Sequence, residues 1–143
     1  MNVRITRLHA SVALPAYQTG GAAGFDLAAS AAMTIQPGEV ALVPTGLVVE
    51  IPAGYFLGIF ARSSTPLKRG LMVANGVGIV DSDYCGPRDE IKIEVLNFTS
   101  SPVSVVPGDR LAQGVILPVA RAEWTEAGAA TGPSRGGFGS TGH

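Results

Sequence analysis

The chain is poor in charge and almost free of cysteine and histidine. Only 15% of its 143 residues are charged, and the formal net charge is −1. A protein that binds nucleic acid irrespective of sequence needs a surplus of lysine and arginine, so this balance argues against such a partner. Cys85 is the single cysteine, which excludes an intramolecular disulfide, and His9 and His143 have no metal-ligand spacing. These absences favour a protein of the reducing cytosol.

Long apolar runs are missing as well. Residues 1–18 alternate charged and apolar side chains and contain no continuous apolar stretch of the signal-peptide kind. No other run approaches the roughly 20 apolar residues that a membrane-spanning helix needs. We therefore expect neither export nor a membrane partner, and a cytoplasmic location.

Glycine, proline and β-branched residues are plentiful. Nineteen glycines and ten prolines separate short runs of valine and isoleucine, and 46% of the residues are apolar, enough for the core of one domain. In the run 91–98, Ile91, Ile93 and Val95 alternate with charged residues, which predicts one buried and one exposed face of a strand. Further strands are expected in residues 3–8, 33–36, 39–51, 55–61, 76–80, 103–106 and 110–119. This rhythm predicts an all-β sandwich, jelly roll or barrel.

Turns and one helix interrupt the strands. Residues 36–39, 51–54 and 106–109 each place proline where a turn begins and glycine where a positive φ is needed. The segment "ARSSTPLKRG" predicts a short helix, the only one expected, which Ser64 would cap and Gly70 would end.

The last part of the chain has the composition of an arm. From Ala120 the alternation stops and glycine, alanine and proline become frequent. We expect a β domain over residues 1–119 and an arm over residues 120–143 that belongs to the same domain. Trp124 is expected to anchor the root of this arm against the body or against a neighbouring subunit.

Several polar stretches could carry chemistry, and each also has a plain structural interpretation. "GVGIVDSDYCG" is either an ordinary turn or, given its glycines inside a strand, a place where something packs close to the backbone. Arg62 and two serines at the mouth of the predicted helix either bind an anion or only cap it. Asp26 in an apolar run either forms a turn or faces a cation, because an unpaired buried carboxylate is costly. In "PGDRLAQ" the polar residues fit a surface ion pair.

The tail "SRGGFGSTG" invites two interpretations. It is either a solubilising end or a phosphate-binding segment, because glycine lets backbone N–H groups approach a phosphate closely.

In order along the chain, "AGFDLAA", "ARSS", "NGVGIVDSDYCG", "PGDRLAQ" and "RGGFGSTG" resemble the five motifs of the trimeric dUTP pyrophosphatase family. The resemblance covers most of the chain. It implies a distorted jelly-roll subunit with a flexible C-terminal arm, and a homotrimer whose active sites each draw on three subunits. It also implies cleavage of dUTP to dUMP and pyrophosphate with Mg²⁺, which limits uracil in DNA and supplies dUMP for thymidylate synthesis.

The resemblance also implies roles for residues around the nucleoside. Asp81 would be the base for the water that attacks the α-phosphorus, and would also reach the 3′-hydroxyl. Tyr84 would pack under the deoxyribose and leave no room for a 2′-hydroxyl. The hairpin of residues 75–80 would read uracil through backbone groups, and Phe138 would stack on the ring. The uracil and sugar contacts carried over in this way are Asn75, Gly78, Val80, Asp81, Tyr84 and Phe138.

The same resemblance implies a phosphate and metal site. Asp26 would act on Mg²⁺ through the water shell of the ion, which suits a metal that keeps several waters. Arg135 is carried over as a γ-phosphate contact, although it stands two residues closer to Phe138 than in the usual family motif. Asp109 and Arg110 would serve folding or the trimer interface. The phosphate contacts carried over are Arg62, Ser63, Ser64, Gln113, Arg135, Gly139, Ser140 and Thr141.

Two alternatives stay open. A dCTP deaminase, with one activity or two, shares the fold but needs a glutamate in the base region, and none replaces Asp81 in "VDSDYCG". A nucleotide-binding trimer without turnover is the other, and the presence of Asp81, Asp26 and Arg62 speaks against it.

Overall fold

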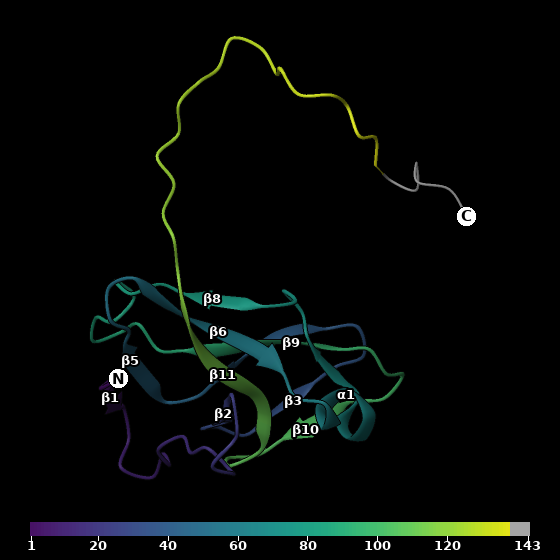
Figure 1. The fold of residues 1–143 in the computed structure, drawn as a ribbon. Coiled ribbons are helices and arrows are strands. Elements are labelled where there is room, and N and C mark those ends of the chain that lie inside the picture. The colour runs from purple at the N-terminus through teal and green to yellow at the C-terminus, as the bar shows by residue number, and fades with distance from the viewer. Residues whose placement is uncertain (138–143) are drawn as a thin grey trace.

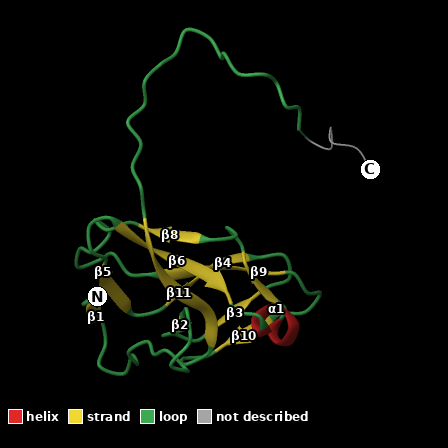
Figure 2. Cartoon of the chain, in the orientation of Figure 1, coloured by secondary structure: helices red, strands yellow, loops and turns green. Residues whose placement is uncertain are grey.

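A computed structural model describes residues 1–137. Nearly all regular structure in this part of the chain is β, with one short helix, as Figures 1 and 2 show. The elements are β1 (Arg4–Arg7), β2 (Phe25–Ala28), β3 (Met33–Ile35), β4 (Val40–Pro44), β5 (Leu47–Glu50), β6 (Tyr55–Ala61), α1 (Ser64–Arg69), β7 (Leu71–Val73), β8 (Gly78–Val80), β9 (Lys92–Asn97), β10 (Val103–Val105) and β11 (Arg110–Pro118). The expected all-β, jelly-roll-like fold with one short helix is confirmed. No described helix has the length and apolar character that crossing a bilayer requires.

The strands pair antiparallel in four small sheets. The largest has the order β2-β11-β6-β8, and a second has the order β4-β9-β7. The pairs β1-β5 and β10-β3 complete the body. Strand β11 therefore lies between strands from much earlier in the chain, with Gln113 opposite Asp26 of β2 on one side and Phe60 of β6 on the other. This register places polar side chains of three distant motifs next to one another.

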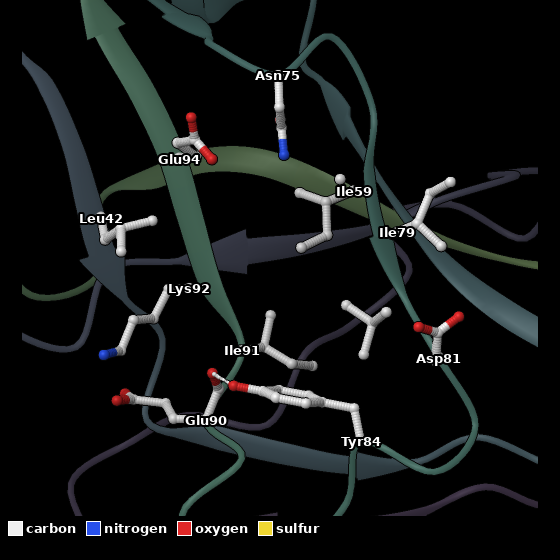
Figure 3. A pocket seen from close by; sticks show the side chains of 12 residues that line it. Leu42, Ile59, Asn75, Ile79, Asp81, Tyr84, Glu90, Ile91, Lys92 and Glu94 are labelled. Atoms are coloured by element: carbon white, nitrogen blue, oxygen red, sulfur yellow. Dashed lines mark hydrogen bonds between the residues drawn. The ribbon is translucent and has the colours of Figure 1, made fainter.

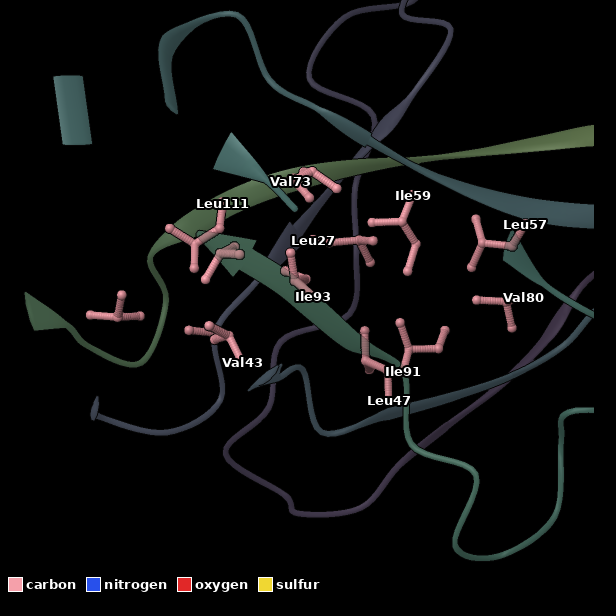
Figure 4. Packing of buried hydrophobic residues seen from close by; sticks show 14 of the residues in the cluster. Leu27, Val43, Leu47, Leu57, Ile59, Val73, Val80, Ile91, Ile93 and Leu111 are labelled. Carbon is pink, nitrogen blue, oxygen red and sulfur yellow. The ribbon is translucent and has the colours of Figure 1, made fainter. Parts of the chain in front are cut away.

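The core lies between the larger sheets and consists of aliphatic side chains. Leu27, Leu57, Ile93 and Leu111 belong to this one cluster (Figure 4), and each of these side chains is fully buried. Ile91, Ile93 and Val95 are buried while Lys92 between them is exposed, so the predicted two-residue periodicity is confirmed. Burial of this apolar face is the main contribution to the stability of the body.

Every predicted run contains a strand, but the structure has two strands that the sequence did not predict. The run 39–51 divides into β4 and β5 at Gly46, whose φ is 68°. Strand β2 was missed because it is four residues long and contains Asp26, so it resembled a turn. Strand β7 was missed because three residues that follow a helix directly carry too little pattern. The predicted turns are confirmed by positive φ at Gly38, Gly54 and Gly108.

The predicted C-terminal end of the helix is confirmed, whereas the predicted N-cap residue is wrong. The N-cap residue is Ser63, which has helical backbone angles and no side-chain cap hydrogen bond, while Ser64 is the first helical residue. The hydroxyl of Thr65 instead ties the helix to β11 by donating to the Leu111 carbonyl over 3.0 Å. Gly70 ends the helix in the left-handed conformation, as predicted.

Residues 120–137 contain no helix or strand and run away from the body (Figure 1). The side chain of Trp124 is 93% exposed. Anchoring of this tryptophan against the body of its own chain is therefore wrong, whereas contact with a neighbouring subunit stays a prediction.

Two glycines with similar backbone angles allow a test of packing at the helix end. Gly70 (φ 66°) and Gly38 (φ 72°) would both be strained by a side chain, but only at Gly70 would a Cβ overlap Thr99. We expect Gly38→Ala to lower the free energy of unfolding by about 1 to 2 kcal/mol. Gly70→Ala should cost about 1 to 3 kcal/mol more, because the Cβ overpacks the site. Urea unfolding measures both, and equal losses would contradict the packing argument.

Candidate active site

The turn between β7 and β8, together with β8, forms one wall of a pocket of about 360 Å³ (Figure 3). The hairpin expected over residues 75–80 is wrong, because β7 pairs with β9 in one sheet and β8 pairs with β6 in another. Strand β8 pairs with β6, so that Gly78 lies opposite Ile59 and Val80 opposite Leu57. A Cβ at residue 78 would approach Ile59 to 3.1 Å, so glycine allows the backbone to lie close to its neighbour. Asn75 extends from the turn between β7 and β8 toward the pocket (Figure 3). The predicted nucleoside residues Asn75, Gly78, Val80, Asp81 and Tyr84 all line this pocket.

Tyr84 and Asp81 stand at the other end of the same pocket. The Tyr84 hydroxyl donates to the Glu90 carbonyl over 3.3 Å, and its ring extends across the pocket in Figure 3. The carboxylate of Glu90 in turn accepts from the Gly46 N–H at 2.7 Å. Asp81 is exposed, and within residues 1–137 its carboxylate has no hydrogen bond or ion pair. It is therefore free to accept a proton or a hydrogen bond from a water or a hydroxyl.

A second cluster lies where β2, β6 and β11 meet. Arg62 Nε lies 2.7 Å from Asp26 Oδ1, and Arg110 Nη1 lies 2.9 Å from Asp26 Oδ2. Arg62 Nη1 also donates to the Arg110 carbonyl over 3.2 Å. The side chain of Asp26 is only 12% exposed, so two arginines compensate a carboxylate that has lost most of its water.

The remaining predicted phosphate contacts surround this cluster. Gln113 Nε2 donates to the Ala61 carbonyl over 3.0 Å, and a Cβ on Gly24 would approach Gln113 Oε1 to 3.0 Å. Gly24 therefore leaves room for this amide. Ser64 lines a basic pocket of about 290 Å³ with Arg62. The hydroxyls of Ser63 and Ser64 make no hydrogen bond within the described chain.

Asp109 belongs to the frame around the cluster. Arg69 donates to both of its carboxylate oxygens over 2.7 and 2.5 Å, and the Val106 N–H donates over 2.9 Å. Burial alone would raise the pKa of Asp109, but the hydrogen bonds from Arg69 and Val106 and the positive charge of Arg69 outweigh it and lower the pKa. This pair ties helix α1 to the turn before β11.

The two clusters lie at opposite ends of β6. Val80 pairs with Leu57, so Asp81 lies beside the beginning of β6, whereas Arg62 follows its last residue. Six residues of extended chain separate these positions, roughly 20 Å at about 3.3 Å per residue. A general base must lie within about 3 Å of the proton that it removes. One chain therefore does not bring Asp81 and Arg62 to the same phosphate.

The other predicted contacts belong to neither cluster. Arg135 lies in the arm that runs away from the body. Phe138, Gly139, Ser140 and Thr141 lie outside the described residues.

The described residues offer no direct metal cage. Within residues 1–137 there is no group of three or more histidine, cysteine, aspartate or glutamate residues that could hold an ion. Both oxygens of Asp26 are already paired with arginines. Such a site fits only an ion that takes its ligands from water and phosphate oxygens, which is the usual behaviour of Mg²⁺.

Comparison with known proteins settles the family. A family model described as dUTPase matches residues 10–142. The chain belongs to the dUTPase family. The resemblance carried by the five sequence motifs is thereby confirmed.

Curated relatives agree along most of the chain. The deoxyuridine 5′-triphosphate nucleotidohydrolase of Desulfitobacterium hafniense is 51% identical over 134 residues, which cover 90% of this chain and 87% of the relative. The protein of the same name from Rhizobium meliloti is 50% identical over 135 residues, 90% of this chain and 82% of the relative.

Solved structures share the fold. A dUTPase from Streptococcus mutans is 34% identical with a TM-score of 0.79, over 87% of this chain and 100% of that one. The dUTPase of Staphylococcus bacteriophage 80alpha, solved with dUPNHPP, is 22% identical with a TM-score of 0.87 over 99% and 98% of the two chains. A mutant dUTPase from phage phi11 of S. aureus, described with a structural Mg(II) ion, is 21% identical with a TM-score of 0.79 over 90% and 98%.

The pair of Asp109 with Arg69 predicts a pH dependence of stability. Because folding lowers the pKa of Asp109, its contribution is complete above the unfolded value of 3.8 and is lost as the pH falls through the folded value. We expect Asp109→Asn to destabilise the protein at about pH 7 and less at about pH 3, where the carboxyl of the unfolded chain is largely protonated and part of the contribution is already lost. Urea unfolding at both pH values measures this, with Glu123→Gln in the exposed arm as control. A loss independent of pH would contradict the charge argument.

Proposed function

We propose that this protein hydrolyses dUTP to dUMP and pyrophosphate. Relatives named deoxyuridine 5′-triphosphate nucleotidohydrolase at 51% and 50% identity support this activity. The observation that carries the mechanism is the carboxylate of Asp81, which is unpaired within the described chain and stands on the rim of a pocket beside the glycine-containing strand β8. A free carboxylate at that place can act as the base for an attacking water.

The pocket fits uracil and deoxyribose. Uracil presents an acceptor, a donor and another acceptor along one edge, and the backbone of residues 75–80 can offer donor, acceptor and donor in matching order. Cytosine would leave buried polar groups unpaired, at about 1 to 3 kcal/mol for each. Tyr84, fixed by its bond to the Glu90 carbonyl, packs under the sugar and leaves no space for a 2′-hydroxyl.

The chemistry is a displacement at the α-phosphorus. Asp81 takes a proton from a water molecule, whose oxygen bonds to the α-phosphorus. The bond from this phosphorus to the bridging oxygen breaks, and pyrophosphate leaves with the electron pair. The cluster of Arg62, Ser63, Ser64 and Gln113 binds the phosphates and compensates their charge, which is the larger part of catalysis in phosphoryl chemistry.

A magnesium ion fits the cluster indirectly. Mg²⁺ held by triphosphate oxygens would neutralise negative charge there, in keeping with the absence of a direct metal cage in residues 1–137. Asp26 would accept hydrogen bonds from the water ligands of the ion. Its carboxylate oxygens would then bind these waters as well as Arg62 and Arg110.

The active unit is a homotrimer in which neighbouring subunits complete each site. The separation of Asp81 from Arg62 along β6 supports this, since one substrate must contact both. The outer face of the β4-β9-β7 sheet also carries an apolar row in register, with Val40 opposite Leu96 and Leu96 opposite Met72. Val40 is 54% exposed and Met72 is 43% exposed in the single chain, so a partner can cover them.

The arm of residues 120–143 closes the site of a neighbour. Trp124, exposed in the single chain, contacts the adjacent subunit. Phe138 stacks on uracil, and Arg135, Gly139, Ser140 and Thr141 bind the outer phosphates. A terminal segment suits this task because it can open for product release. The enzyme acts in the cytoplasm, where it limits uracil in DNA and supplies dUMP for thymidylate synthesis.

Asp81→Asn tests the base. We expect turnover of dUTP to fall by about 10² to 10⁴-fold, with binding of a non-hydrolysable imido analogue retained, because the water loses its proton acceptor. Pyrophosphate release from dUTP, UTP, dTTP and dCTP, with ammonia release from dCTP, measures activity and selectivity in one experiment. Asp83→Asn in the same turn is the control. A near-normal rate for Asp81→Asn would show that another group is the base.

Mixing two inactive variants tests the shared site. Asp81→Asn and Arg62→Gln should each be nearly inactive alone. If a site takes Asp81 from one subunit and Arg62 from the next, some sites of mixed trimers contain both intact residues. Random cyclic trimers assembled from equal amounts of the two chains should have about one quarter of their sites intact. The two chains are refolded together and the rate is compared with that of wild type. No recovery in the mixed trimers would mean that one chain supplies both groups.

A further inference from the structure

Arg110 belongs to the ion cluster that it forms with Asp26 and Arg62. The proposed reaction assigns Arg110 no contact with the substrate. Its Nη1 donates to Asp26 Oδ2 over 2.9 Å, and its carbonyl accepts from Arg62 Nη1 over 3.2 Å. With the 2.7 Å contact between Arg62 Nε and Asp26 Oδ1, these bonds form a closed ring of three residues. The ring connects β2, the end of β6 and the start of β11.

A β-bulge places Arg110 in this ring. In the pairing of β11 with β2, Gln113 lies opposite Asp26 and Ala112 opposite Leu27, but the register shifts before Arg110, which lies opposite Ala28. Without the shift, alternation would put Arg110 on the other face of the sheet from Asp26. The bulge brings it to the same face, which is a recognised use of such irregularities beside functional sites.

We propose that Arg110 is a positioning residue that holds Arg62, through Asp26, in the orientation needed to bind the triphosphate. This inference rests on the proposed function. Arg62 uses Nε and Nη1 within the ring, and its Nη2 has no hydrogen bond among residues 1–137, which leaves that end for a phosphate oxygen. Asp26 alone would neutralise Arg62, whereas two arginines around one carboxylate keep a net positive charge on the cluster.

The partial burial of Asp26 makes the arrangement sensitive to Arg110. Its side chain is 12% exposed, so the loss of one partner leaves Oδ2 poorly solvated. Arg62 then becomes the sole cation on both oxygens and is drawn from the orientation in which Nη2 faces the phosphates. Arg69 cannot replace Arg110, because both carboxylate oxygens of Asp109 already hold it.

The test compares Arg110→Gln and Arg110→Lys with wild type. We expect Arg110→Gln to raise KM for dUTP, and the dissociation constant of a non-hydrolysable imido analogue, about tenfold, with a smaller change in kcat. Inhibition by deoxyuridine, which has no phosphate, should stay unchanged, and Arg110→Lys should recover part of the affinity. The control is Arg4→Gln, which removes an exposed arginine 3.5 Å from Glu50 on another sheet.

A double-mutant cycle with Asp26→Asn separates positioning from direct phosphate contact. Because Arg110 acts through Asp26, Arg110→Gln should change the analogue affinity little in the Asp26→Asn background. Affinity losses of the two single variants that add in the double variant would overturn the inference. An unchanged KM in Arg110→Gln, or an equal weakening of deoxyuridine and triphosphate binding, would overturn it as well. Failure of wild type to release pyrophosphate from dUTP would instead refute the proposed function, so the two failures are distinguishable.

Discussion

The extended backbone of β6 fixes how far the two halves of the candidate site lie from each other. Its pairing with β8 sets Asp81 beside its first residues, and its last residue leads directly into Arg62. A paired strand cannot shorten, and β6 is held along its whole length by its pairing with β11. β6 keeps Asp81 and Arg62 of one chain apart. The exposed apolar row of the β4-β9-β7 sheet and the exposed arm are both explained if the missing half of each site comes from another copy of the chain.

Around Asp26, charge compensation and strand register depend on each other. Asp26 can be largely buried only because two arginines reach it, and one of them reaches it only because β11 contains a bulge. The neighbouring pair of Arg69 and Asp109 fixes the turn from which that bulged strand begins. The arginines at this end of the molecule therefore divide between Arg69, which pairs with Asp109 in the turn, and Arg62 and Arg110, which pair with Asp26.

The sequence predicted the fold class well, because alternation in runs such as 91–98 reflects burial on one face of a strand. It failed where the pattern was short, as in β2 and β7, and at the helix cap, where Ser63 and not Ser64 occupies the boundary. The candidate residues were found through the family motifs. Their division into two clusters could not be found, because the pairing of Asp26 with Arg110 spans 84 positions and depends on register.

The backbone of β8 contributes to one wall of the pocket, and Gly78 allows it to lie close to β6. Every residue except proline carries the same backbone N–H and C=O groups, so most point mutations leave these groups in place while they exchange the side chain. Under the proposed function, inhibitors that imitate the edge of the base would bind backbone groups that few point mutations remove. Escape would require a change in the length or path of the loop, which the packing of β8 on β6 opposes.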